Sequence, residues 1–429
     1  MQGNAMARRL VLSTLALRCR CHASSNGRRF CTARASQALA AAFSASAAHP
    51  ARPRSPGHRR LLARRPLGAA SGGAELDPLD PSGPLLDPLR DLCSGSLPVP
   101  SSLSPSAVGE FRACPQSYLF QYLLGLRQPT NEALARGSLC HSALEKVYDL
   151  DPDHRTRENL RNLLRAAWAE ERLSDRYRHL FEVEEEAEEV GGSRRDLEAE
   201  IRWGKSALAL LDRYFDCEDP RAIPAPNPLE REMWVRSRLA GGGGEKFLVR
   251  GIVDRIDLVQ GDFLRIVDYK TGKCPDFKYS PATNERIADE AFFQLKIYAL
   301  LLREMVRADQ AAPDGEGGEK KKGGGLPFNL RSGIPVRRLR LLYLTSNSGE
   351  ARYLDMDLGE TAAERDAILD AVRDDLVEAW TAIGRLVRTN DPRSFVHCDR
   401  PFCWCHKVRH RFEPGTVWER ERPPSEAHM

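Results

Sequence analysis

Two aspartates and a lysine share one face of a hairpin that the sequence predicts for residues 251–273. Both arms of GIVDRIDLVQGDFLRIVDYKTGK are rich in Ile, Val and Leu, and residues 260–262 between them are of turn-forming types. Side chains alternate between the faces of a strand, so Asp254, Asp268 and Lys270 lie on the even-numbered faces of the two arms. The apolar neighbours on that face of the first arm are Ile252, Ile256 and Leu258.

The predicted register brings the two carboxylates together. A three-residue loop makes Val259 face Phe263, and counting back from that pair places Asp254 opposite Asp268. Directly opposed side chains have Cβ atoms ~4.5–5.5 Å apart, and like charges at that distance repel. A salt bridge of Lys270 with one aspartate would explain an isolated Asp-x-Lys motif. The second aspartate on the same face favours a divalent cation, because half-buried carboxylates need a compensating charge.

Two predicted helices each carry a pair of polar side chains. His141 and Glu145 are four residues apart in GSLCHSALE, and Gln294 and Tyr298 are four apart in FFQLKIYALLL. Residues with this spacing share one face of a helix, and each pair by itself is typical of a packed helix with a polar edge. In chain order, however, the motifs are Gly-x-x-x-His-x-x-x-Glu, Gly-x-x-Asp-Arg-x-Asp, Asp-Tyr-Lys-Thr-Gly and Gln-x-x-x-Tyr.

This series of motifs resembles the RecB-like exonuclease branch of the PD-(D/E)XK nuclease superfamily. The resemblance extends from Ser106 to the C-terminal cysteines, and its specific part is the pair Gly-x-x-Asp-Arg and Asp-Tyr-Lys-Thr-Gly. It implies that His141, Asp254 and Asp268 bind a metal ion, with the carbonyl group of Tyr269 as a further ligand. Such an oxygen-rich site suits Mg²⁺ or Mn²⁺, and the imidazole shifts the preference slightly towards Mn²⁺.

The resemblance also implies roles for neighbouring side chains. Lys270 would position the attacking water and stabilise the charge that develops on the scissile phosphate. Gln294 and Tyr298 would border the DNA path or support Lys270. Glu145 would be a structural support, and Glu230 in the preceding strand is a weaker catalytic candidate. Because a bound metal ion lowers the pKa of water and clamps phosphate oxygens, these groups support phosphodiester hydrolysis.

A second set of candidate ligands consists of cysteines. Cys114 lies in RACPQSY, and FVHCDRPFCWCHK contains Cys398, Cys403 and Cys405. Several RecB-like nucleases hold a [4Fe–4S] cluster with one early and three late cysteines, so the resemblance implies such a cluster here. The late spacing, Cys-x4-Cys-x-Cys, departs from the family's Cys-x2-Cys followed by a more distant cysteine. The alternatives are unusual ligands such as His406, a zinc ion, or cysteines that bind nothing.

The first 74 residues differ in composition from the rest of the chain. They contain 13 Arg, no Lys and no acidic residue, which is typical of an organelle transit peptide, whereas a basic nucleic-acid-binding tail usually includes Lys. Their Ser and Ala content favours a chloroplast over a mitochondrion as the destination. Without them the chain has 51 basic against 60 acidic residues, so the net charge changes from +4 to about −9. DNA contacts must therefore come from local patches.

The composition also excludes several classes of protein. No run approaches the ~20 apolar residues of a membrane helix, so no membrane partner is expected. The eleven cysteines are scattered and do not form the framework of a secreted disulfide-rich protein. No helicase P-loop motif occurs, so any unwinding of DNA would come from a partner helicase, and a single-strand-binding protein is a further candidate partner.

The elements that must position these residues predict an α/β fold. Helices are expected from Ser104 or Ser106 and in residues 134–150, 157–179, 194–216, 292–305 and 361–388. Strands are expected in residues 229–239, 246–259, 263–270 and 336–345, and the acidic run 182–190 is expected to be a solvated face or loop. By the resemblance, the core is a restriction-endonuclease-like mixed sheet with helical cover and a helical extension.

The predicted organisation has four parts. They are a transit peptide at 1–74, a disordered linker at 75–103, a nuclease domain at 104–415 with a disordered insertion at about 309–333, and a tail at 416–429. We expect a metal-dependent DNA exonuclease that prefers single strands and serves organelle DNA repair or recombination. The alternatives are a catalytically inactive nucleic-acid-binding module, and a structure-specific endonuclease or RNase with the same metal site.

Overall fold

The computed structural model describes residues 96–184, 193–222, 228–241, 244–311, 330 and 333–409. These belong to one compact unit, formed by residues 1–18 and 76–429, and a second unit, residues 19–75, lies outside the described residues. The predicted transit peptide, the tail at 416–429 and most of the predicted insertion at 309–333 lie outside them as well. None of the described helices has the length and apolarity needed to cross a membrane.

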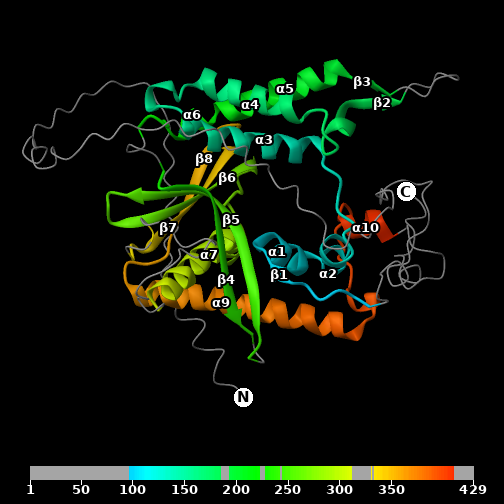
Figure 1. Ribbon diagram of the computed structural model, residues 1–429, viewed down its shortest axis with the longest axis vertical. Coiled ribbons are helices and arrows are strands. Elements are labelled where there is room, and N and C mark those ends of the chain that lie inside the picture. The colour runs from blue at the N-terminus through cyan, green and yellow to red at the C-terminus, as the bar shows by residue number, and fades with distance from the viewer. Residues whose placement is uncertain are drawn as a thin grey trace, which may run out of the picture. The chain divides into compact units, whose positions relative to one another are not determined.

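A six-stranded mixed sheet forms the centre of the fold (Figure 1). Its strands are β1 (Ser102–Leu103), β4 (Glu230–Ala240), β5 (Lys246–Val259), β6 (Phe263–Lys273), β7 (Val336–Thr345) and β8 (Arg352–Asp357). The order is β1-β5-β6-β7-β8, and β4 pairs with β5 outside this path. The β4–β5, β5–β6 and β7–β8 pairs are antiparallel, whereas β1–β5 and β6–β7 are parallel. A separate sheet pairs β2 (Glu182–Glu184) with β3 (Ser193–Arg195).

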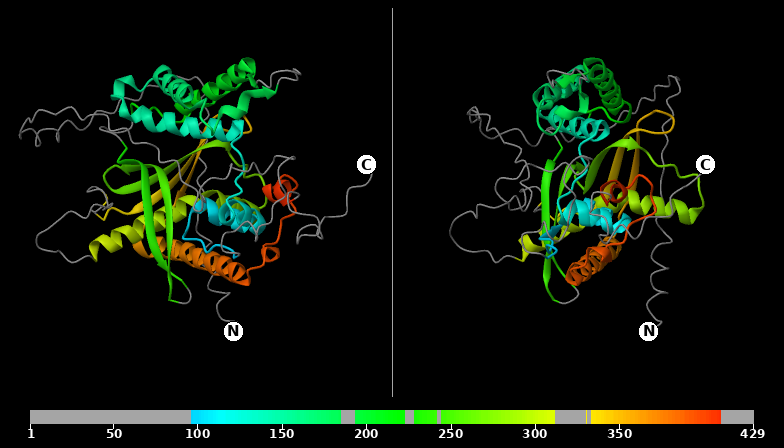
Figure 2. Two further views of the ribbon diagram at one scale, coloured as in Figure 1. Left: turned by 45° about the vertical axis from the view of Figure 1, so that its right-hand side comes forward. Right: turned by 90° about the vertical axis from the view of Figure 1, so that its right-hand side faces the viewer.

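Helices cover both faces of the sheet (Figure 2). The α-helices are α1 (Pro105–Ala113), α2 (Pro115–Tyr118), α3 (Glu132–Lys146), α4 (Arg157–Glu171), α5 (Leu197–Asp212), α6 (Tyr214–Cys217), α7 (Pro281–Gln310), α9 (Ala362–Thr389) and α10 (Trp404–Val408). The π-helix is η3 (Leu119–Leu123), and the 3₁₀ turns are η4 (Val147–Asp149), η5 (Pro152–His154), η6 (Arg178–Phe181) and η7 (Pro392–Ser394). The long α7 connects the parallel strands β6 and β7, as such a crossover requires.

Alternate residues of β6 belong to two different hydrophobic clusters. Leu264 and Ile266 pack with residues of α1, α7 and α9, whereas Val267 and Tyr269 pack with residues of α3, α4 and α5. Because successive side chains of a strand point to opposite faces, the sheet separates the two clusters. Figure 1 shows α3, α4 and α5 together above the strands and α9 below them. The predicted α/β fold is confirmed: a mixed sheet with helical cover, in which α3, α4 and α5 form the helical extension.

The ends of the fold differ from the prediction. Leu97 is buried and donates its backbone N–H to Oδ1 of Asn390, at 2.7 Å, and β1 then pairs with β5. Residues 96–103 of the predicted linker are therefore part of the fold. The short strands β1, β2, β3 and β8 were not predicted, and β2 begins the acidic run that was expected to be a loop or a solvated face.

The predicted first helix is interrupted at Cys114. It begins as expected, because Ser104 is the N-cap of α1 and accepts a hydrogen bond from the N–H of Ala107. Pro115 has no N–H, and a residue before proline disfavours helical dihedrals, so α1 ends at Ala113 and α2 starts at Pro115. Cys114 thereby becomes the N-cap of α2, in extended conformation (φ −162°).

Candidate active site

The site lies where β5 and β6 stop pairing. The ladder runs from Val259 opposite Phe263 to Arg255 opposite Val267, which confirms the predicted three-residue loop and its register. One residue further along, Oδ2 of Asp254 accepts a hydrogen bond of 2.9 Å from the backbone N–H of Tyr269. The Asp254 carboxylate thus accepts a hydrogen bond that a backbone carbonyl group would accept in a regular ladder. This bond fixes the Asp254 side chain beside β6.

The strict alternation predicted for β5 is wrong at this point. Val253 and Ile256 are both buried in the same hydrophobic cluster, although an odd-numbered and an even-numbered residue should face opposite sides. Ile252 therefore does not share the inner face with Ile256. The pairing strand β4 is irregular opposite this position, where Glu232 has φ 45°. Beside this irregularity, the Asp254 carboxylate contacts His141 of α3, in the helical extension.

His141 on α3 contacts the Asp254 carboxylate. Its Nδ1 lies 3.2 Å from Oδ2 of Asp254. Burial lowers the pKa of this imidazole, but the hydrogen bond and charge of Asp254 outweigh burial and raise the pKa to about 8. Gly137 allows α3 to approach β6, because a Cβ at that position would lie only 3.1 Å from Oγ1 of Thr271.

Asp268 and Lys270 form the second half of the site. Nζ of Lys270 forms an ion pair with Oδ2 of Asp268, at 2.7 Å, and the lysine lowers the pKa of this carboxyl group. Burial, followed by the charge of Asp254, raises the pKa of Asp268 to about 6. The pKa stays raised although an ammonium group lies 2.7 Å away, so one lysine does not offset the two carboxylates, and the residues present fit a bound cation.

Two residues of α7 hold the Lys270 ammonium group in place. Nζ of Lys270 donates to Oε1 of Gln294, at 3.0 Å, and Nε2 of Gln294 donates to the hydroxyl oxygen of Tyr298, at 2.8 Å. The Tyr298 ring lies against Gly251, where a Cβ would fall 2.5 Å from Cε1 of the ring. Gly251, which opens the Gly-x-x-Asp-Arg motif, is therefore required by packing. The hydrogen bonds from Lys270 to Gln294 and from Gln294 to Tyr298 favour a role of the two α7 residues in supporting Lys270.

Sequence reasoning missed Glu232. Arg231 pairs with Arg255 and Met233 pairs with Val253, so Glu232 lies opposite Asp254. Burial raises the pKa of Glu232 to about 7, with a further contribution from the charge of Asp254. Glu230, the acidic residue chosen from the sequence in this strand, pairs instead with Ile256, beyond the site. The two glutamates share one face in an ideal strand, so their sequence pattern carried no signal that distinguished them.

The buried Arg255 supports the site through hydrogen bonds to neighbouring side chains. Arg255 is fully buried, and its Nη1 donates to the hydroxyl of Tyr269 at 2.8 Å, to that of Tyr148 at 3.0 Å and to Oε2 of Glu218 at 2.9 Å. This network ties the Asp254–Arg255 segment of β5 to the helical extension. The Tyr269 side chain is thus a structural anchor, and its backbone N–H orients Asp254. Glu145 contributes its carbonyl oxygen as an acceptor for Nη1 of Arg231.

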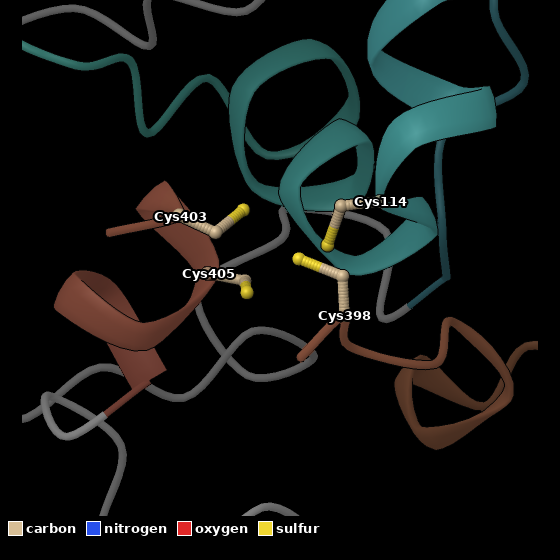
Figure 3. A group of neighbouring side chains, drawn as sticks. All are labelled: Cys114, Cys398, Cys403 and Cys405. Carbon is tan, nitrogen blue, oxygen red and sulfur yellow. The ribbon is translucent and has the colours of Figure 1, made fainter. Parts of the chain in front are cut away.

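The four predicted cysteines come together from opposite ends of the domain (Figure 3). The sulfur atoms of Cys114, Cys398, Cys403 and Cys405 all lie within 4.8 Å of one another. In the described part of the chain this is the one group of three or more His, Cys, Asp or Glu side chains gathered closely enough to share a metal ion, and His141 and the two aspartates are not so gathered. Figure 3 shows the four thiols pointing towards a common centre.

The surroundings of this cysteine group favour a thiolate at Cys114, whereas the hydrogen bond with Cys114 raises the pKa of Cys405 and burial raises the pKa of Cys403. A hydrogen bond with the Cys405 thiol lowers the pKa of Cys114 to about 5 despite its burial. The Sγ of Cys114 also accepts from the N–H of Ser117, at 3.4 Å, and Arg400 directs its guanidinium at Sγ of Cys398 and of Cys403. Four thiolates are the ligand set of both a tetrahedral zinc site and a [4Fe–4S] cluster.

His406 is not part of this group. Its Nε2 lies 2.8 Å from the carbonyl oxygen of Cys398, so the imidazole supports the backbone beside the cysteines instead of supplying a ligand. The helix α10 has a contact with the start of the domain that needs no metal, because Nε1 of Trp404 donates to the carbonyl oxygen of Leu126, at 2.8 Å.

Comparison with known families identifies this arrangement. A sequence model described as the PD-(D/E)XK nuclease superfamily matches residues 102–405, which contain the carboxylates, the lysine and the four cysteines. The chain belongs to this superfamily. Members of this nuclease superfamily are typically metal-dependent phosphodiesterases, so nucleic acid is the substrate class that membership implies.

Two other comparisons add little to the superfamily assignment. Among solved structures, the chain is similar to that of the "Crystal structure of SSO0001", at 10% sequence identity over 68% of this chain and 82% of that one, with a TM-score of 0.25. So low a score carries no argument. No curated protein matches the chain.

Proposed function

We propose that this PD-(D/E)XK superfamily member is a metal-dependent DNA exonuclease that prefers single strands. The observation that carries the proposal is the buried carboxylate of Asp268 beside that of Asp254, because Lys270, 2.7 Å from Asp268, does not offset burial and the charge of Asp254. A cation at this site would relieve the charge of Asp268 and Asp254 together. His141, in contact with Asp254, completes the proposed ligand set, and the carbonyl oxygen of Tyr269 is proposed as a further ligand.

The side chains divide the chemistry among them. A bound Mg²⁺ or Mn²⁺ would supply an acidified water and a clamp on the phosphate oxygens. Lys270 lies between Asp268 and Gln294, so its ammonium group is fixed where negative charge develops on the scissile phosphate. Glu232, whose pKa is about 7, is suited to hold a proton at neutral pH.

The test is cleavage of end-labelled single-stranded and double-stranded DNA and RNA by the full chain in Mg²⁺, Mn²⁺ or EDTA. We expect a ladder of successively shorter single-stranded DNA products with either metal and none in EDTA, and no products from Lys270→Met. Cleavage of circular single-stranded DNA would indicate an endonuclease, and cleavage of RNA alone an RNase. Binding without any cleavage would identify an inactive nucleic-acid-binding module and defeat the proposal.

We further propose that the four cysteines bind a [4Fe–4S] cluster. The burial of Cys114, Cys403 and Cys405, the low pKa of Cys114 and the Arg400 guanidinium are consistent with a centre that carries negative charge. Zinc is the alternative occupant, and metal analysis distinguishes the two. Such a centre would fasten the last described helix to the start of the domain.

The cellular setting is proposed from the sequence. The acid-free first 74 residues are proposed to direct the protein to the chloroplast, with the mitochondrion as the alternative. A fusion of these residues to a fluorescent reporter should enter an organelle, and cytosolic or nuclear fluorescence would contradict the assignment. In DNA repair or recombination, a helicase or single-strand-binding protein would present the substrate strand.

A further inference from the structure

The β4–β5 hairpin has one face in the core and one face in solvent. The inward residues of β4 are buried, and they are Met233, Val235 and Leu239. The residues between them point outward: Arg236 and Arg238 are exposed, and Trp234 is 54% exposed. An indole that is more than half exposed on a hairpin with arginines on the same face needs an explanation, because tryptophan is usually covered.

The register concentrates positive charge on this outward face. Arg236 is directly opposite Arg250, Trp234 is opposite Ile252, and Arg238 is opposite Leu248. Like charges that face each other across an antiparallel pair are unfavourable. Within the described ranges, none of the three guanidinium groups forms an ion pair or a hydrogen bond, and the one side-chain contact of Arg236 is made by its backbone N–H, which donates to Sδ of Met305 at 3.4 Å. Their guanidinium groups are therefore available to an anionic ligand.

The outward face leads directly to the metal site. Continuing the same pairing past Trp234 and Ile252 gives Glu232 and Asp254, which face each other at the site. Same-face residues of a strand are ~6.8 Å apart, so Arg250 lies two such steps from Asp254. A ligand extended along the hairpin would meet the indole first and the arginine pair next, counting outward from the carboxylates.

The chemistry of this face suits a flexible polyanion with free aromatic rings. Guanidinium groups bind phosphate oxygens, and an exposed indole stacks on an unpaired base. In a duplex the bases are stacked on one another and cannot lie on Trp234. We propose that Trp234, Arg236, Arg238 and Arg250 form a track for the single-stranded DNA that enters the metal site, with Trp234 stacking on a base near the scissile phosphate. The track rests on the proposed function and specifies how that function selects its strand.

The stacking contact is tested by binding in EDTA, where no hydrolysis occurs. Fluorescence anisotropy of a labelled thymidine oligomer would be measured with the full chain and with Trp234→Leu and Trp234→Phe. We expect the leucine variant to bind at least about fivefold more weakly, the lower bound for a base stacked on an aromatic ring. The phenylalanine variant should recover most of that loss, since it restores a ring but not the indole N–H.

The phosphate contacts are tested by the salt dependence of the same binding. Each phosphate contact on a single strand contributes about 0.7 to the slope of log K against log salt concentration, so Arg236→Gln with Arg250→Gln should reduce the slope by about 1.4. Arg385→Gln is the matched control, because Arg385 is an exposed arginine on α9, away from the hairpin. Its slope should equal that of the wild type.

Failure of the track and failure of the proposed function give different results. If neither the Trp234 substitutions nor the arginine substitutions change the affinity or the salt slope, the proposed track is wrong. Tighter binding of duplex DNA or of RNA than of single-stranded DNA would also overturn it. If instead the wild type binds single-stranded DNA through these residues but cleaves nothing in Mg²⁺ or Mn²⁺, the track stands and the nuclease function is wrong.

Discussion

The carboxylate of Asp254 accepts a hydrogen bond of 2.9 Å from the backbone N–H of Tyr269, just beyond the last pair of the β5–β6 ladder. This single oxygen atom therefore has a structural partner as well as a proposed metal. An asparagine can keep the structural contact through its amide oxygen, whereas an alanine cannot. The two functions of the side chain can thus be separated by substitution.

We predict that Asp254→Asn abolishes cleavage and leaves the thermal midpoint of the apo-protein unchanged or higher. Asp254→Ala should also abolish cleavage, but it should cost about 1–3 kcal/mol of stability, because it leaves the N–H of Tyr269 unsatisfied. Cleavage rates in Mg²⁺ and unfolding midpoints in EDTA measure the two effects. Near wild-type hydrolysis by Asp254→Asn would show that this carboxylate is not a metal ligand.

The second prediction concerns the pH dependence of apo stability at Asp268. Its pKa is about 6 in the folded protein against an ordinary value of 3.8, so the folded state binds the proton more tightly. The contribution of this group to stability is therefore present below pH 3.8 and is lost as the pH rises through 6. A shift of about two units corresponds to ~3 kcal/mol at most.

We accordingly expect Asp268→Asn to unfold at a higher temperature than the wild type in EDTA at pH 7.5. The difference should shrink as the pH is lowered towards 4, where the wild-type carboxyl is protonated. In excess Mg²⁺ the order should reverse, because only the wild type gains the free energy of metal binding. A variant that is less stable than the wild type in EDTA at pH 7.5 would mean that Asp268 is not electrostatically strained.

The third prediction separates Gln294 from Tyr298. Gln294→Leu removes a hydrogen bond to a charged group, worth ~1.5–3 kcal/mol, so we expect kcat to fall about 10- to 150-fold with little change in KM. Tyr298→Phe removes only the neutral partner that orients the amide, and about a 2- to 10-fold loss of kcat should follow. Equal effects of the two substitutions, or effects on KM alone, would favour a DNA-contacting role over support of Lys270.

The fourth prediction concerns the cysteine group. Protein purified without oxygen should be brown and contain iron and sulfide, and Cys114→Ser should lose both together with thermal stability. The centre links residues nearly 300 apart in sequence, and a cross-link over so long a loop constrains the unfolded chain strongly. Cys217→Ser is the control, because Cys217 lies outside the group. If the protein contains zinc instead of iron, or if Cys114→Ser leaves the thermal stability unchanged, the proposal of an iron–sulfur cluster is wrong.

Local chemistry in the sequence was enough to locate the catalytic hairpin. The bounds of β5 and β7 are the predicted ones, and α9 runs from Ala362 to Thr389 against a predicted 361–388. The turn at 260–262 fixed the register, because Gln260 and Gly261 adopt positive φ and close a three-residue loop. Once that register holds, the opposition of Asp254 and Asp268 follows from counting residues.

The tertiary structure decided what local patterns leave open. The pairing of β4 with β5 places Glu232 instead of Glu230 opposite Asp254, and the Nε2 of His406 contacts a backbone carbonyl oxygen instead of the cysteine group. The cysteine spacing departs from the family pattern, yet four sulfurs meet because α2 and α10 pack together. The sequence determines which residues alternate between strand faces, cap helices and form turns, because those preferences depend on a few neighbouring residues. Which of several equivalent side chains reaches the site depends on twist and packing between distant segments, and only the folded chain sets these.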